Sequence, residues 1–84
     1  MKYTVYWLPD VEQELADLWL SAPGRGAVTR AAHAIDRFLQ SDPQNAGESR
    51  PNGRRILFAP PLGVLIRVIP DDLRVEIVHL WRFD

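Results

Sequence analysis

The stretch RRILFAPPLGVLIRVIPDDLRVEIVHLWRF, residues 54–83, decides the fold of this chain. Its β-branched, aromatic and other apolar side chains gather in three runs, which are residues 54–59, 63–69 and 73–83. Pro60-Pro61-Leu62 separates the first two runs, and Pro70-Asp71-Asp72 separates the last two. Because proline and aspartate favour turns, we predict three consecutive strands paired as an antiparallel meander.

The segments before this meander predict one more strand and two helices. Residues 2–8 (KYTVYWL) are rich in aromatic and β-branched side chains, which favours a strand. Apolar residues then recur with helical spacing over residues 11–19 and again over residues 28–39, with a proline-glycine breaker between them. Residues 41–53 carry almost no apolar side chain and predict a surface loop. The expected fold class is therefore α+β in the order β-α-α-β-β-β, with a helical hairpin packed on one face of an antiparallel sheet.

The composition limits the classes of function. The chain has 84 residues, 46% hydrophobic and 25% charged, which predicts a single domain over residues 1–84. It has no cysteine, which excludes a disulfide scaffold, a thiolate zinc site and a cysteine nucleophile. We expect no metal and no cofactor. No apolar run is long enough to cross a bilayer, and residues 1–8 lack a secretory signal, so we expect a cytoplasmic protein with no membrane partner.

The charges are distributed unevenly along the chain. The net charge is only -1, yet residues 25–67 hold seven arginines against three acidic residues, a local balance of +4. Nine of the ten basic residues are arginine, the side chain that binds phosphate and carboxylate with two parallel hydrogen bonds. One side of the molecule is therefore expected to be basic. The alternative is a set of ordinary solvated arginines.

A turn on Asp71-Asp72 sets the predicted register of the last hairpin, with Arg67 opposite Glu76 and Val64 opposite His79. Alternation then gives one face to Val64, Ile66, Val68, Val75 and Ile77, which receives the helices. The other face, free of helices, receives Leu65, Arg67, Arg74, Glu76, Val78, Leu80 and Arg82.

The same reasoning places Arg55 opposite Arg67. Like charges in that arrangement cost stability, and a bound anion would relieve it. The alternative is that Glu76 bridges Arg67 in an exposed pair worth at most about 1 kcal/mol, while Arg55 points away.

Four segments form an ordered set that covers nearly the whole chain. They are YTVYWLP, DVEQELADLWL, AAHAIDRFLQSDP and NGRRILFAPPLGVLIRVIPDDLRVEIVHLWRF. Their order, spacing and total length resemble the RelE/ParE toxins of bacterial type II toxin–antitoxin systems, a group that includes plasmid stabilisation proteins. The resemblance implies a cytoplasmic toxin that a cognate antitoxin protein neutralises by wrapping its surface. RelE-like members cut messenger RNA in the ribosomal A site, whereas ParE-like members inhibit DNA gyrase and cleave nothing.

The resemblance also implies candidate catalytic residues. Arg55 and Arg67 resemble the sheet arginines that orient and neutralise the scissile phosphate in nuclease members, and Arg82 resembles the C-terminal basic position. Glu76 is a candidate base unless Arg67 holds it. The chain departs from the nuclease pattern at Phe83, where relatives often place a histidine or tyrosine, because phenylalanine transfers no proton.

Two further groups of residues carry hypotheses about chemistry and partners. His79 has an imidazole suited to acid–base work, but the predicted register places it towards the helices, so we interpret it first as a core residue and only then as a catalytic one. Trp81 and Phe83, together with Leu20 on the first helix, are candidate anchors for an antitoxin segment that folds on binding. Leu65, Val78 and Leu80 are expected to add an apolar floor to the helix-free face. The alternative for each is ordinary core packing.

The charge balance separates the candidate activities. A net charge of -1 argues against a ribosome-dependent nuclease, because binding to RNA rewards a large excess of arginine and lysine. We therefore place a ParE-like inhibitor of DNA gyrase ahead of a RelE-like messenger RNA endoribonuclease acting on the ribosome. A degenerate, non-toxic binding module of the same fold is the third hypothesis. The oligomeric state, monomer or homodimer, stays open.

Overall fold

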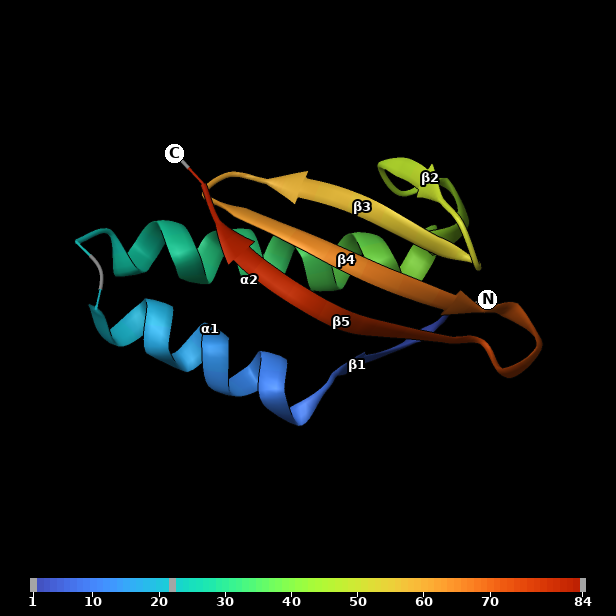
Figure 1. Cartoon of the computed structure of the whole chain (residues 1–84), viewed down its shortest axis with the longest axis horizontal. Coiled ribbons are helices and arrows are strands. Elements are labelled where there is room, and N and C mark those ends of the chain that lie inside the picture. The colour runs from blue at the N-terminus through green and yellow to red at the C-terminus, as the bar shows by residue number, and fades with distance from the viewer. Residues whose placement is uncertain (1, 22, 84) are drawn as a thin grey trace.

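The computed structural model describes residues 2–21 and 23–83 (Figure 1). Its elements are β1 (Thr4–Trp7), α1 (Pro9–Ser21), α2 (Arg25–Ser41), the 3₁₀ turn η1 (Pro43–Asn45), β2 (Glu48–Arg50), β3 (Arg54–Ala59), β4 (Leu62–Ile69), the 3₁₀ turn η2 (Pro70–Asp72) and β5 (Arg74–Arg82). The predicted α+β class and the predicted strands and helices are confirmed. The segment expected to be a loop instead contains η1 and the short strand β2. Neither helix in the described part of the chain is long and apolar enough to cross a membrane.

The five strands form one sheet in the order β1-β5-β4-β3-β2. The strands β2 to β5 pair antiparallel, as the meander predicts, but β1 pairs parallel to β5 rather than antiparallel. The helical hairpin explains this orientation, because it returns the chain to the end of the sheet where β1 begins. There the backbone N–H of Tyr3 donates to the carbonyl of Gln40, near the end of α2, at 2.7 Å.

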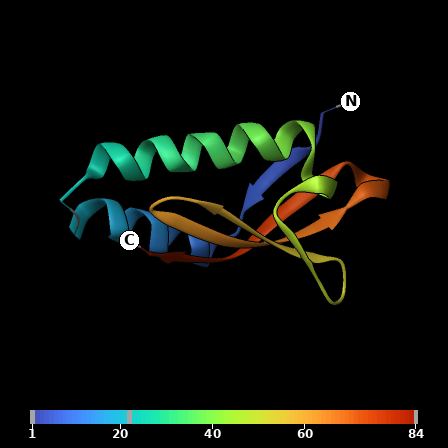
Figure 2. The same cartoon turned by 90° about the horizontal axis from the view of Figure 1, so that it is seen from above.

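Both helices cover the same face of the sheet, and the other face, here named the open face, has no helix over it (Figures 1 and 2). Apolar side chains from the covered face and from the helices form the core. Its fully buried members include Val11, Val28, Ile35, Leu39, Leu62, Val64, Ile66, Val75 and Ile77. Four of the five sheet residues predicted to face the helices are fully buried, and Val68 packs partly buried against them.

A bulge in β5 changes the predicted register of the last hairpin. Arg67 pairs with Glu76 as predicted, but one additional residue at Val78 shifts the pairing, so Leu65 lies opposite His79 rather than Val78. The expectation that His79 faces the helices is wrong, because this shift carries it to the open face, where it is exposed. The bulge has the opposite effect on Leu80, which it places on the covered face. The regular alternation predicts it on the helix-free face, but it is only 5% exposed and belongs to the core.

A tight turn also changes the predicted pairing of β3 with β4. Ala59 pairs with Leu62, so only Pro60 and Pro61, joined by a cis peptide bond, form the connection. The sequence-based register requires a longer turn and places Arg55 opposite Arg67. That assignment is wrong by one residue, and because strand side chains alternate between faces, Arg54 takes the position opposite Arg67.

Gly47 is a position where the fold requires glycine. Its φ of 50° is left-handed, and a Cβ there would overlap the backbone carbonyl of Ile56. We expect Gly47→Ala to lower the free energy of unfolding by more than about 2 kcal/mol, because neither backbone can move aside easily. Gly24 is the matched control, since its φ is 91° but a Cβ there would meet no atom within 4 Å. Gly24→Ala should cost only about 1 kcal/mol. Urea denaturation followed by circular dichroism measures both, and equal losses would contradict this account.

Candidate functional site on the open face

Three arginines stand side by side across the open face. Arg50 on β2 pairs with Arg54 on β3, and Arg54 pairs with Arg67 on β4. The same line continues through Glu76 on β5 to Tyr6 on β1. Because directly opposed strand residues point to the same side, this line crosses all five strands. We name Arg50, Arg54 and Arg67 the arginine row.

Glu76 neutralises one end of this line. The residue is 7% exposed, and Arg67 donates to its Oε1 from Nη2 at 2.5 Å and from Nε at 3.2 Å. Arg74 donates to Oε2 from Nε at 3.0 Å, while its guanidinium lies 4.0 Å from the centre of the Tyr6 ring. The hydrogen bond from Arg67 lowers the pKa of Glu76, burial opposes this, and the charges of both arginines lower the pKa further. Glu76 is therefore held as a carboxylate that bridges two cations, which leaves it poorly placed to act as a base.

The hydrogen bonds between Arg67 and Glu76 confirm the alternative in which Glu76 bridges Arg67 and Arg55 points away. The pair is stronger than that alternative assumes. The sequence-based value of at most about 1 kcal/mol applies to an exposed pair. With the carboxylate buried, loss of Arg67 leaves Oε1 without its donors, and that costs about 1–3 kcal/mol.

The other end of the row carries uncompensated positive charge. Arg54 is exposed and forms no ion pair with any residue that the structure describes. Arg50 meets the exposed carboxylate of Glu48 at 3.4 Å and donates to the backbone carbonyl of Ser49 at 2.8 Å. The sequence analysis did not identify Arg54 as a residue of the open face. A correct length for the turn at Pro60-Pro61 would have identified it. A two-residue turn exchanges the faces of Arg54 and Arg55.

The four predicted catalytic residues do not meet at one place. Arg55 pairs with Ile66, on the covered face, and donates from Nε to the carbonyl of Ala46 at 2.5 Å and from Nη2 to that of Gly47 at 3.3 Å. Arg82 lies opposite the fully buried Leu62, so its register also assigns it to the covered side. Only Arg67 and Glu76 of the predicted group touch each other on the open face.

An aromatic cluster of Phe58, Trp81 and Phe83 occupies the far end of the open face. The Phe58 ring lies edge-on to Trp81 at 6.0 Å and to Phe83 at 5.2 Å between ring centres. Glycine at position 63 leaves space for the Trp81 side chain, because a Cβ there would lie 2.5 Å from the indole. Phe58 remains 53% exposed, so the cluster presents apolar surface to solvent.

The residues predicted to bind a partner divide between two surfaces. Leu65 and Val78 are partly buried on β4 and at the bulge of β5, between the arginine row and the aromatic cluster. Trp81 and Phe83 are in the cluster itself. Leu20 is 61% exposed but lies on α1, whereas Leu80 is buried in the core and out of reach of a partner.

His79 lies between the two ends of the open face. It is exposed and pairs with Leu65, two residues along β4 from Arg67, so His79 and Arg67 are diagonal neighbours whose backbones lie about 8 Å apart. The predicted hydrophobic alternation of β5 could not reveal this position, because it depends on the bulge.

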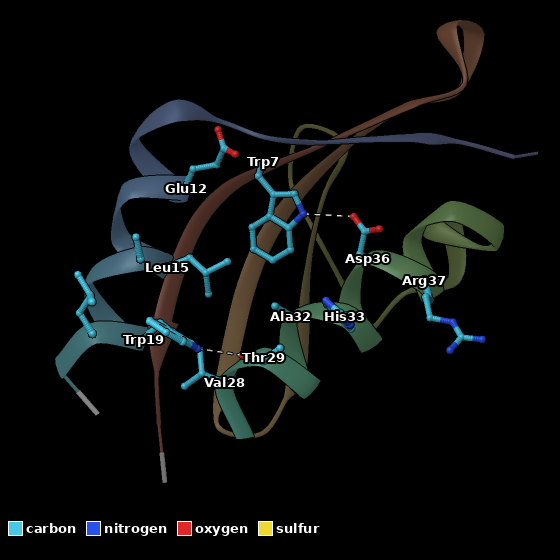
Figure 3. A pocket seen from close by; sticks show the side chains of 12 residues that line it. Trp7, Glu12, Leu15, Trp19, Val28, Thr29, Ala32, His33, Asp36 and Arg37 are labelled. Carbon is cyan, nitrogen blue, oxygen red and sulfur yellow. Dashed lines mark hydrogen bonds between the residues drawn. The ribbon is translucent and has the colours of Figure 1, made fainter. Parts of the chain in front are cut away.

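A groove of about 810 Å³ runs between α1 and α2 (Figure 3). Trp7 and Leu15 line it, and so does Trp19, which is 40% exposed although the sequence pattern assigns it to the core stripe of its helix. Hydrogen bonds fix both indoles. Trp7 donates to Asp36 Oδ1 at 3.2 Å, and Trp19 donates to Thr29 Oγ1 at 3.1 Å. The result is a preformed, mainly apolar channel on the side of the molecule remote from the open face.

Neither surface offers a metal site. Within residues 2–21 and 23–83, no three histidine, aspartate or glutamate side chains are grouped closely enough to hold a metal ion.

Comparison with solved structures identifies the fold. A chain of the toxin–antitoxin complex RelBE2 from Mycobacterium tuberculosis superposes with a TM-score of 0.77 and 19% identity, covering 98% of this chain and 92% of that one. A chain of the chromosomal ParDE toxin–antitoxin system from P. aeruginosa superposes with a TM-score of 0.72 and 18% identity, covering 99% and 98%. No protein-family model and no curated protein sequence matched the chain. The protein therefore has the RelE/ParE toxin fold.

The lowered pKa of Glu76 predicts a specific dependence of stability on pH. Since the folded pKa lies below the unfolded one, the ion pairs stabilise the fold above the unfolded pKa and are lost as the pH falls towards the folded pKa. We expect Glu76→Gln to lower the free energy of unfolding by about 1–3 kcal/mol at neutral pH, with a gap to the wild type that narrows below about pH 4. Urea titrations at a series of pH values measure this gap. The exposed Glu12→Gln is the control, and a gap that stays constant with pH would refute the assignment.

Proposed function

We propose that this protein is the toxin of a type II toxin–antitoxin pair and a ParE-like growth inhibitor that binds DNA gyrase through its open face without cutting RNA. The RelE/ParE fold supports the toxin assignment. The observation that carries the choice of activity is the dispersal of the predicted nuclease residues. Arg55 holds backbone carbonyls, Glu76 is bound by two arginines, and Arg82 pairs with a core position.

The chemistry of the open face suits a protein target. Arginine and tryptophan contribute disproportionately to the binding energy of protein interfaces, and aromatic residues are enriched there. The arginine row and the aromatic cluster place both kinds of side chain on the open face, with Leu65 and Val78 between them. Arg54 supplies charge that no acidic side chain of the described chain neutralises, and a complementary acidic patch on gyrase would do so.

The groove between α1 and α2 is the surface that we assign to the cognate antitoxin. It is apolar, preformed and lined by two tryptophans, which suits the apolar side of a helix that folds on binding. The strongly exposed Leu20 borders it and would anchor the same segment. An antitoxin that continues from this groove to Trp81 and Phe83 would also cover the open face.

A gyrase assay tests the proposed activity. Purified protein should inhibit supercoiling by gyrase, and Arg54→Ala should weaken this inhibition at least tenfold because it removes the unpaired charge of the row. Its free energy of unfolding should change by less than about 0.5 kcal/mol, since Arg54 has no partner within the described residues to lose. Arg30→Ala, an exposed change on α2, is the control. If gyrase supercoils normally with the protein in large excess, the gyrase assignment fails.

A RelE-like ribosome-dependent nuclease is the second candidate, and the position of His79 favours it. An imidazole on the open face, near Arg67, could accept the proton of an attacking ribose 2′-hydroxyl while guanidinium groups offset the charge on the phosphate.

Primer extension on translated messenger RNA after induction of the protein distinguishes the two activities. The nuclease requires cuts in the ribosomal A site that His79→Gln reduces at least 100-fold, a loss within the range expected for a general acid–base group. Absence of cuts in the wild type removes the nuclease. Normal growth on overexpression, together with negative results in both assays, would leave only the non-toxic binding module.

A further inference from the structure

A second, smaller cavity of about 310 Å³ lies where the β2–β3 hairpin meets the end of β4, away from the α1–α2 groove. Its lining includes Gln44, Ser49, Gly53, Arg54, Arg55 and Val68. We name it the β2–β3 cavity. Two guanidinium groups, a hydroxyl and a side-chain amide line this cavity beside the apolar Val68 and Pro70.

The fixed position of Arg55 is the first argument for a ligand. Two backbone carbonyls, those of Ala46 and Gly47, accept from its Nε and one Nη, which holds the guanidinium plane at the wall of the cavity. Carbonyl dipoles orient a cation but do not neutralise it. Two of the five N–H donors of an arginine are used in this way, so the others remain for an anion.

The absence of a neutralising carboxylate is the second argument. Neither Arg54 nor Arg55 forms an ion pair with an acidic residue in the described parts of the chain. The nearest acid in sequence, Glu48, is engaged by Arg50 at 3.4 Å. Asp71 and Asp72 follow the end of β4 but are exposed and pair with neither arginine.

The remaining polar groups complete a site for a phosphate. Ser49 lies directly opposite Arg55 in the β2–β3 ladder, and the Gln44 amide lines the same space, so both can donate to an oxyanion. Val68 supplies an apolar wall. Guanidinium groups match the geometry of phosphate oxygens with paired hydrogen bonds.

From these observations we infer that the β2–β3 cavity is a binding site for a phosphate group carried by a ligand no larger than a nucleoside monophosphate or the terminal nucleotide of a strand. The cavity is open to solvent, which leaves room for an organic group attached to the phosphate. The inference rests on the lining of the cavity and not on the proposed toxin activity, although Arg54 belongs to both the cavity and the arginine row.

Titration of the ¹⁵N-labelled protein followed by NMR tests this site. Inorganic phosphate should cause saturable shifts of the Ser49 and Gly53 amides and of Arg55 Nε, whereas chloride at the same ionic strength should not. Arg55→Lys keeps the charge but loses the planar fork, and should weaken phosphate binding at least tenfold. Arg54→Gln and Ser49→Ala leave the Arg55 hydrogen bonds intact and should each weaken it several-fold. Arg30→Gln is the matched loss of charge elsewhere and should leave binding unchanged.

Two further titrations identify the source of the phosphate. Adenosine monophosphate should bind more tightly than inorganic phosphate if the ligand is a free nucleotide. A short DNA strand with a 5′-phosphate should bind more tightly than the same strand without it if the ligand is a strand end. The proposal is overturned if phosphate shifts do not saturate, if chloride reproduces them, or if Arg30→Gln weakens binding as much as Arg54→Gln. If Arg55→Lys does not fold, the other two variants decide.

Discussion

The pairing of β4 with β5, interrupted by the bulge at Val78, is the constraint on which the two faces of the sheet depend. Before the bulge, alternation buries Val75 and Ile77 and places Glu76 on the open face. After it, the alternation is inverted relative to a regular strand, so Leu80 enters the core and His79 leaves it. Without the additional residue, the terminal half of β5 would present its apolar side chain to water and its imidazole to the helices.

The fold could be predicted from the sequence because the strands and helices are long and their apolar periodicity is strong. Arg54–Ala59 matches the predicted strand at both ends, and the core residues of β4 and β5 near the Asp71-Asp72 turn follow directly from alternation. The candidate site was only partly predictable. Arg67 and Glu76 lie close to that turn, where no error of register has accumulated, so their contact follows from the sequence.

Positions farther from the turn were assigned wrongly for two physical reasons. A bulge leaves no mark in a pattern of apolar residues, so the faces of His79, Leu80 and Arg82 could not be obtained by counting. The number of residues in the Pro60-Pro61 turn is likewise set by local backbone geometry, and an error of one residue exchanged Arg54 with Arg55. The parallel pairing of β1 is a property of the chain path and has no local signature.

The three tryptophans place an intrinsic fluorophore on each of the two surfaces. Trp7 and Trp19 line the groove between the helices, whereas Trp81 lies on the opposite side over Gly63. Tryptophan fluorescence shifts to shorter wavelength when the indole is shielded from water. A molecule that covers one side of the domain therefore shifts the emission of the indoles on that side and leaves the emission of the others unchanged. Trp81→Phe leaves only the groove indoles, and Trp7→Phe combined with Trp19→Phe leaves only Trp81, so intrinsic emission of these two variants would reveal which side a bound macromolecule occupies without any added dye.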